Sequence, residues 1–88
     1  MEIRFEASFE KDLKKVRDKK LLKRVKEVIE EVKQAEDLRV INDLKKLKGY
    51  DTFYRIRVGD YRIGIDIVEN RVIFARILHR KEIYKYFP

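Results

Sequence analysis

Apolar residues recur at two different spacings along the chain, and the change in spacing separates a helical first part from a β-rich second part. Polar and apolar residues alternate over residues 2–5, which predicts a short strand. From Phe9 to about Arg17 the apolar residues recur at helical spacing, and Ser8 is the expected N-cap of this first helix.

A longer helix is expected to follow, with Asp18 as its cap. Its apolar positions form one stripe: Leu21, Leu22, Val25, Val28, Ile29, Val32 and Ala35. The opposite face carries charges of both signs and suits water. Because the link between the two helices is short, they are expected to form an antiparallel hairpin whose task is to cover a sheet.

The rest of the chain predicts a sheet and a final helix. Residues 36–49 are less regular, and four apolar residues there are expected to tether the segment to the core: Leu38, Ile41, Leu44 and Leu47. Three strands and a helix should follow: Tyr54–Val58, Tyr61–Ile67, Val72–Leu78 and Arg80–Phe87. The predicted fold class is α+β, a small antiparallel sheet covered on one face by the helical hairpin, with a short C-terminal helix.

The turn between the first two of these strands sorts their side chains onto two faces. Gly59-Asp60 is a two-residue turn with glycine first, typical of a type II′ hairpin. It places Arg57 opposite Arg62 and Arg55 opposite Gly64, since side chains alternate along a strand. Apolar side chains then share the face that the helices can cover: Tyr54, Ile56, Val58, Tyr61, Ile63 and Ile65. Gly64 should leave a hollow that a backbone or ligand can approach closely.

The other face of the hairpin carries three arginines, Arg55, Arg57 and Arg62, called the arginine face below. Opposed like charges destabilise a strand pair by about a few tenths of a kcal/mol, and the sequence suggests no partner for this pair other than a ligand. The guanidinium fork matches phosphate oxygens, so the arginine face favours an anion or nucleic-acid site over a merely solvated surface.

The next strand should extend this face. If the alternation of side chains continues into this strand, Arg76 and Arg80 lie on the same side of the sheet as the arginine face, with Phe74 and Leu78 between them. Such a positively charged surface with apolar residues among the charges is expected to bind an acidic, amphipathic protein segment.

The net charge of +7 is concentrated in the second half of the sequence. Residues 1–44 hold 12 Lys or Arg and 11 Asp or Glu, whereas residues 45–88 hold 11 and 5. A positive field of this kind attracts polyanions such as RNA, DNA or an acidic protein.

Several kinds of chemistry are excluded or disfavoured by what the sequence lacks. The absence of cysteine excludes disulfides and thiolate metal sites. A single histidine excludes a nuclease with paired imidazoles, and the three glycines form no phosphate-binding loop. The carboxylates lack metal-ligand spacing. No signal peptide or membrane span is expected behind Met1, so the 88 residues predict a single cytoplasmic domain without metal or cofactor.

Two stretches together resemble a known family. "LKGYDTFYRIRVGDYRIGI" followed by "ILHRKEIYKYF" is similar to the RelE branch of the RelE/ParE toxins of bacterial and archaeal toxin–antitoxin systems. The resemblance spans nearly the whole chain and implies a ribosome-dependent endoribonuclease that cuts mRNA in the decoding site. It also implies a cognate antitoxin that neutralises the toxin, with operator DNA bound only through the complex of the two proteins.

The resemblance assigns roles by position. The catalytic positions match Arg55, Arg57, Arg62, Arg80 and Tyr84. Apart from these matched positions, six further side chains are expected to bind RNA: Lys45, Lys46, Lys48, Arg76, His79 and Lys81. Tyr84 and His79 are the alternative acid–base groups, and Tyr86 lies near enough in sequence to compete with Tyr84 for the tyrosine position.

One departure from the family bears on mechanism. Some members have lysine at the positions of Arg55 and Arg57, and an arginine keeps its proton where a buried lysine can lose it. These two arginines are therefore expected to act as electrostatic clamps. Two alternative functions stay open: a ParE-like inhibitor of DNA gyrase, and a catalytically silent homologue that acts only in a repressor complex with its antitoxin.

Overall fold

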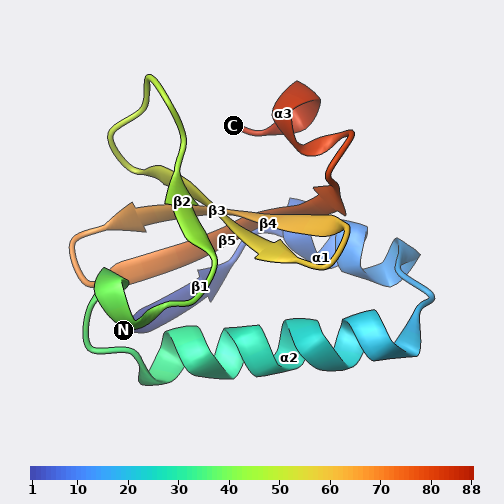
Figure 1. Ribbon diagram of the computed structural model, residues 1–88, viewed down its shortest axis with the longest axis horizontal. Coiled ribbons are helices and arrows are strands. Elements are labelled where there is room, and N and C mark those ends of the chain that lie inside the picture. The colour runs from blue at the N-terminus through green and yellow to red at the C-terminus, as the bar shows by residue number, and fades with distance from the viewer.

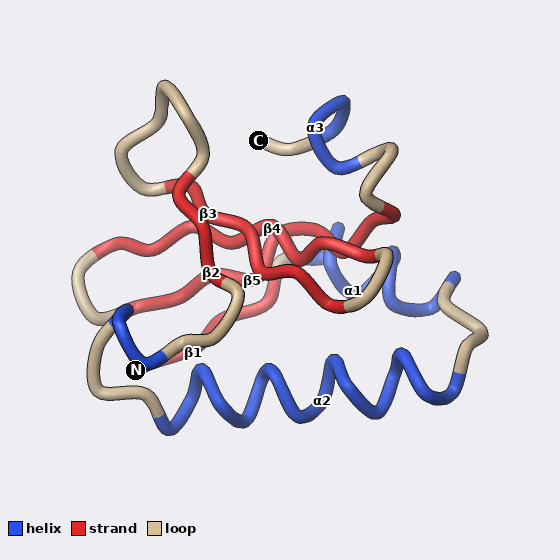
Figure 2. The backbone as a smooth tube through the Cα atoms, in the orientation of Figure 1, coloured by secondary structure: helices blue, strands red, loops and turns tan.

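The computed structural model describes residues 1–88 as one mixed sheet with helices on its flanks. In chain order the elements are β1 (Glu2–Phe5), α1 (Ala7–Lys15), α2 (Lys19–Gln34), a 3₁₀ turn η1 (Leu38–Val40), β2 (Leu44–Lys46), β3 (Phe53–Val58), β4 (Tyr61–Val68), β5 (Arg71–His79) and α3 (Ile83–Tyr86). The strands lie in the order β1-β5-β4-β3-β2. Neighbouring strands from β2 to β5 are antiparallel, and β1 pairs in parallel with β5 at the edge of the sheet. Figure 2 shows the strands in red and the helices in blue. The α+β class is confirmed.

Helix α2 covers one face of the sheet. Figure 1 shows it running beneath the strands. Asp18 caps it as predicted, because its carboxylate accepts hydrogen bonds from the backbone N–H groups of Lys20 and Leu21. The predicted stripe packs against the sheet, with Val25 and Val32 fully buried. No helix is both long and apolar enough to cross a membrane.

Helix α1 lies along the edge of β5 beyond the end of β1. The Ser8 hydroxyl donates to the carbonyl of Ala75 over 2.6 Å, and the Asp12 carboxylate accepts from the backbone N–H of Ile77 over 3.1 Å. The prediction of Ser8 as N-cap is therefore wrong: Glu6 is the cap, and Ser8 bonds to the open strand edge instead. The helix supplies partners that a sixth strand would otherwise provide.

The β3–β4 hairpin has the predicted register. Arg57 pairs with Arg62 and Arg55 pairs with Gly64. Gly59 has φ of +59°, as the first position of a type II′ turn requires. The apolar residues that alternate with these arginines face the main core, where Ile56, Val58, Ile63 and Ile65 are buried.

An irregularity in β5 overturns one prediction. Ile65 pairs with Phe74 and Gly64 pairs with Arg76, so Ala75 is an extra residue that shifts the register. Phe74 consequently lies in the main core against Phe9 and is fully buried, whereas the prediction placed it among the arginines. Leu78 stays on the predicted side, paired with Arg62. Because of the extra residue, Phe74 and Arg76 lie on opposite faces of the sheet, whereas regular alternation would place them on the same face.

The segment between α2 and β3 holds more structure than predicted. It contains the 3₁₀ turn η1 and the edge strand β2, whose Lys45 pairs with Arg55. The predicted anchoring is confirmed, since Ile41 and Leu47 are buried and Leu38 and Leu44 pack against the core. This segment therefore brings Asp43 and Lys45 to the edge of the arginine face.

The C-terminal segment covers the sheet on the side opposite to α2 (Figure 1). Only Ile83–Tyr86 is helical, and residues 80–82 form a turn, so the predicted helix over Arg80–Phe87 is too long. A second, smaller core lies beneath this segment: Leu47, Ala75, Ile83 and Phe87, with Phe53 and Leu78 packed against it. A Cβ atom on Gly64 would lie 2.6 Å from the Phe87 ring. The expected open hollow at Gly64 is therefore filled by Phe87.

The contact between Gly64 and Phe87 leads to a first prediction. Gly64→Ala should force the ring of Phe87 off the sheet and lower the free energy of unfolding by about 1–3 kcal/mol. Urea titration measures the loss, and hydrogen exchange should show faster exchange of the Phe87 amide, which donates to the carbonyl of Ile83. Gly64→Ala with Phe87→Leu should recover part of the stability. Full stability of Gly64→Ala alone would contradict this packing.

Candidate anion-binding site

Arginines from four parts of the fold line one polar surface hollow of about 420 Å³. Arg57 comes from β3, Arg62 from β4, Arg80 from the turn after β5, and Arg24 from α2. The other lining residues are Asp43, Gly59 and Asp60, and no apolar residue contributes. The backbone N–H of Arg80 donates to the carbonyl of Asp60 over 2.7 Å, which fixes the turn after β5 beside the hairpin turn.

Arg62 is the most constrained of these arginines. Its Nη1 donates to the carbonyls of Gly59 and Tyr61 over 2.8 and 2.9 Å, which folds the side chain back onto the turn. Burial lowers the pKa of the Arg62 guanidinium from its ordinary value, and the nearby charge of Arg55 lowers it further. Arg57 and Arg80 act in the same direction, and Tyr84 opposes them. The other four predicted catalytic residues therefore lie close enough to Arg62 to act on its charge, although an arginine stays charged at neutral pH.

Asp43 bonds to two arginines of the arginine face and corrects an expectation. Its Oδ1 accepts from Nη2 of Arg57 over 3.3 Å, and its carbonyl accepts from Nη1 of Arg55 over 3.1 Å. The sequence suggested that only a ligand relieves the repulsion between Arg57 and Arg62, whereas Asp43 supplies a counter-charge from outside the paired strands. The pair of Asp43 and Arg57 is half exposed, so its contribution to stability is small.

Arg24 lines the same hollow, although the sequence pattern does not point to it. The pattern predicts only that its helix covers the sheet and turns a charged face to water. The structure brings Arg24 to the hairpin turn, where it lines the polar hollow and makes no hydrogen bond or ion pair of its own. The signal was weak in the sequence, because Arg24 is one of several basic residues on a face of mixed charge.

The two C-terminal tyrosines lie on different sides of the C-terminal segment. Tyr84 is 63% exposed and lies near Arg62. The Tyr86 ring lies 6.0 Å from the guanidinium carbon of Arg76, at another hollow. Of the two candidates for the tyrosine position, Tyr84 is the one beside the arginine cluster.

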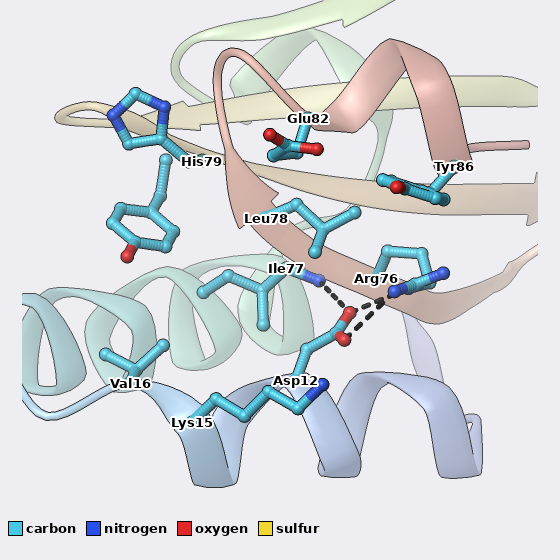
Figure 3. A pocket seen from close by; sticks show the side chains of 10 residues that line it. Asp12, Lys15, Val16, Arg76, Ile77, Leu78, His79, Glu82 and Tyr86 are labelled. Atoms are coloured by element: carbon cyan, nitrogen blue, oxygen red, sulfur yellow. Dashed lines mark hydrogen bonds and ion pairs between the residues drawn. The ribbon is translucent and has the colours of Figure 1, made fainter.

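Arg76 and His79 belong to that other hollow, which lies between α1 and the C-terminal segment (Figure 3). Arg76 donates from Nε and Nη2 to the Asp12 carboxylate over 2.7 and 3.0 Å, and this bonding raises the pKa of Arg76. The His79 ring packs edge-on against Tyr61, on the face opposite to the arginines. The structure therefore separates both residues from the arginine cluster, and it pairs Arg76 with a buried carboxylate.

The four lysines assigned to RNA binding are all exposed. Lys45 shares a face with Arg55, its partner across the strands, and Lys48 lines a hollow beside Tyr84. Lys46 pairs with Tyr54 and so points to the face that α2 covers. Lys81 lies in the turn after β5, where its backbone N–H donates to Nδ1 of His79.

The arrangement suits the binding of a phosphate group more than acid–base chemistry. Four guanidinium groups converge on one hollow, and Tyr84 is the nearby phenol. No group of three or more carboxylate or imidazole side chains converges to hold a metal ion. Arginines held in place by a sheet and a tight turn can stabilise negative charge on a phosphoryl group without rearranging.

Comparison with known proteins gives consistent matches over nearly the whole chain. Residues 3–84 match the model of a family described as "ParE toxin of type II toxin-antitoxin system, parDE". The sequence is 49% identical to Toxin RelE3 of Methanocaldococcus jannaschii over 89 residues, which covers 100% of both chains. It is 37% identical to Putative toxin RelE1 of the same organism over 62 residues, 69% of each chain.

Solved structures show the same similarity. The RelB–RelE antitoxin–toxin complex from Methanococcus jannaschii matches with a TM-score of 0.81 and 49% identity, over 97% of this chain and 99% of that chain. The RelBE2 toxin–antitoxin complex from Mycobacterium tuberculosis matches with a TM-score of 0.72 and 27% identity, over 90% and 96%.

The contrast between Arg76 and Arg80 gives a stability prediction. Arg76→Ala should lower the free energy of unfolding by about 1.5–3 kcal/mol, because it leaves the buried Asp12 carboxylate without its charged donor. Arg80→Ala should change it by no more than about 0.5 kcal/mol, because the Arg80 side chain is exposed and bonds to nothing. Urea titrations of the two variants test this. Equal effects would show that the roles of these arginines are misassigned.

Proposed function

The chain belongs to the RelE/ParE family of toxins of type II toxin–antitoxin systems, and we propose that it acts as a ribosome-dependent endoribonuclease on mRNA. The observation that carries this proposal is the convergence of Arg57, Arg62 and Arg80 on one polar hollow with Tyr84 nearby. This arrangement supports phosphate recognition at a single point on a nucleic-acid backbone.

The proposed reaction is a transesterification within the RNA strand. The ribose 2′-oxygen attacks the adjacent phosphorus, a new 2′-O–P bond forms, and the P–O5′ bond breaks to give a cyclic phosphate and a free 5′-hydroxyl. Arg57, Arg62 and Arg80 stabilise the added negative charge on the phosphoryl oxygens. The 2′-hydroxyl loses one proton and the 5′-oxygen gains one, so a single group can accept the first and return it to the 5′-oxygen, and Tyr84 is the proposed carrier.

Dependence on the ribosome follows from the small number of proton-transfer groups. Arginine is a poor proton carrier, and His79 lies on the opposite face of the sheet. The protein therefore contributes mainly electrostatic stabilisation, and alignment of the 2′-oxygen with the phosphorus must come from elsewhere. A ribosome that holds the mRNA in its decoding site can provide this alignment.

Inhibition of DNA gyrase is the second candidate, because the matched family model bears the ParE name. Mapping of cellular mRNA ends by primer extension after induction separates the alternatives. The ribonuclease produces cuts in phase with codons, a gyrase inhibitor produces DNA damage without such cuts, and a silent homologue produces neither. The arginine cluster favours the ribonuclease.

Expression of the toxin without its antitoxin should stop translation, and Arg80→Ala should abolish the arrest. The side chain of Arg80 lines the hollow without supporting the core, so we expect a folded protein whose cleavage of mRNA on purified ribosomes falls at least about 100-fold, the scale on which loss of one charge-stabilising donor acts. Arg71→Ala is the matched control, because it removes an exposed arginine at the far end of β5. An undiminished toxicity of folded Arg80→Ala would reject the proposed site.

The antitoxin should neutralise the same surface. We expect an acidic, amphipathic segment to cover Arg55, Arg57 and Arg62 or to displace residues 80–87, beneath which Leu47, Ala75 and Leu78 lie. Hydrogen exchange of the complex with the antitoxin should then show protection along β3 and β4 or loss of protection in α3. Protection confined to the outer face of α2 would contradict this mode of neutralisation.

A further inference from the structure

The free protein already places a carboxylate within the proposed phosphate site. Asp43 lines the hollow together with Arg57, Arg62 and Arg80, and its Oδ1 lies 3.3 Å from Nη2 of Arg57. A carboxylate oxygen offers a guanidinium the same kind of acceptor that a phosphate oxygen offers. Arg57 cannot direct that N–H to a phosphate while it donates to Asp43.

The backbone of Asp43 is held much more firmly than its side chain. Its carbonyl accepts from the backbone N–H of Arg57 over 3.2 Å and from Nη1 of Arg55 over 3.1 Å. The residue has φ of +59°, a conformation that aspartate and asparagine tolerate better than most residues do. The side chain is 44% exposed and makes one hydrogen bond, to Arg57. Rotation of the side chain alone therefore releases Arg57, with no change in the strands.

We propose that Asp43 is an internal counter-ion that occupies the anion site in the free protein and must be displaced by the phosphate of the substrate. This inference rests on the proposed function, since it concerns how the same site selects its ligand. Asp43 offsets the repulsion between Arg57 and Arg62 while the site is empty. A phosphate that enters the hollow must compete with it for Arg57 and also meets its negative charge at close range.

This competition sets a threshold that an anion must exceed in order to bind through Arg57. A loosely bound polyanion that contacts only Arg57 gains little, because it exchanges one anionic partner of that arginine for another. A phosphate aligned to contact Arg57, Arg62 and Arg80 together gains two further charged contacts, which outweigh the loss of one. Asp43 thus lowers the affinity of every anion that needs Arg57 by the same factor, and an anion that also contacts Arg62 and Arg80 has binding free energy to spare.

The test compares two variants that remove the same charge from the same hollow. Asp43→Asn keeps the size of the side chain and the backbone conformation. Asp60→Asn is the control, because Asp60 lines the same hollow but its side chain bonds to neither Arg57 nor Arg62. At low salt, Asp43→Asn should bind inorganic pyrophosphate and a short oligouridine about two- to five-fold more tightly than the wild type does, the range expected for a half-exposed ion pair. The gain should shrink as salt rises, and Asp60→Asn should give less than half of it.

A double-mutant cycle assigns the effect to Arg57. In an Arg57→Gln background the gain in anion affinity from Asp43→Asn should fall to the gain from Asp60→Asn, because the guanidinium for which Asp43 and the anion compete is absent. Equal gains in anion affinity for Asp43→Asn and Asp60→Asn would overturn the proposal, because they would show a general electrostatic effect of removing one negative charge from the hollow. Weaker binding by Asp43→Asn would overturn it in favour of a residue that positions the arginines for ligand.

These measurements need no ribosome, so they separate the two proposals. Failure of the wild type to cleave mRNA on ribosomes would reject the ribonuclease and leave the anion competition to be decided by the affinities. Equal affinities of wild type and Asp43→Asn for pyrophosphate would reject the counter-ion and leave the ribonuclease untouched.

Discussion

The pairing of β3 with β4 through a two-residue turn is the constraint on which the other features depend. Because the turn admits a single register, every second side chain of the hairpin faces the core and the others face the opposite side. Ile56 and Ile63 are buried under α2, and Arg57 faces Arg62 on the other side. A shift of one residue would bury the arginines and expose the isoleucines. The hydrophobic core therefore enforces the crowding of positive charge.

Crowded guanidinium groups would make a poor structural element, yet the fold tolerates them at modest cost. Arg57 is exposed to water, Arg62 bonds to carbonyls of its own turn, and Asp43 supplies one negative charge. None of these partners saturates the cluster, because each guanidinium carries five N–H donors. Arg76 shows the opposite case, since two of its donors meet a buried carboxylate in a bidentate pair. The difference between satisfied and unsatisfied arginines distinguishes Arg76, which supports the fold, from the arginines of the proposed anion site.

Features set by neighbours in sequence could be predicted, and features set by distant contacts could not. The cap at Asp18 and the turn at Gly59 each depend on a few adjacent residues, and both were predicted correctly. The pairing of Asp12 with Arg76 joins residues 64 positions apart, and either residue alone resembles any other surface charge. The extra residue at Ala75 cannot be recognised in the pattern of apolar residues, so the predicted orientation of Phe74 was wrong. Only the three-dimensional packing decides such choices.

The small core beneath the C-terminal segment has a consequence for cooperativity. Its four buried residues form a cluster distinct from the fifteen of the main core, and the segment is joined to the rest of the chain only through the end of β5. Such a unit can open with a free energy below that of global unfolding. Opening of this unit would move Tyr84 away from Arg62 while the main core stays folded. Packing beneath the segment, as at Gly64, therefore affects the position of the tyrosine as well as the stability of the fold.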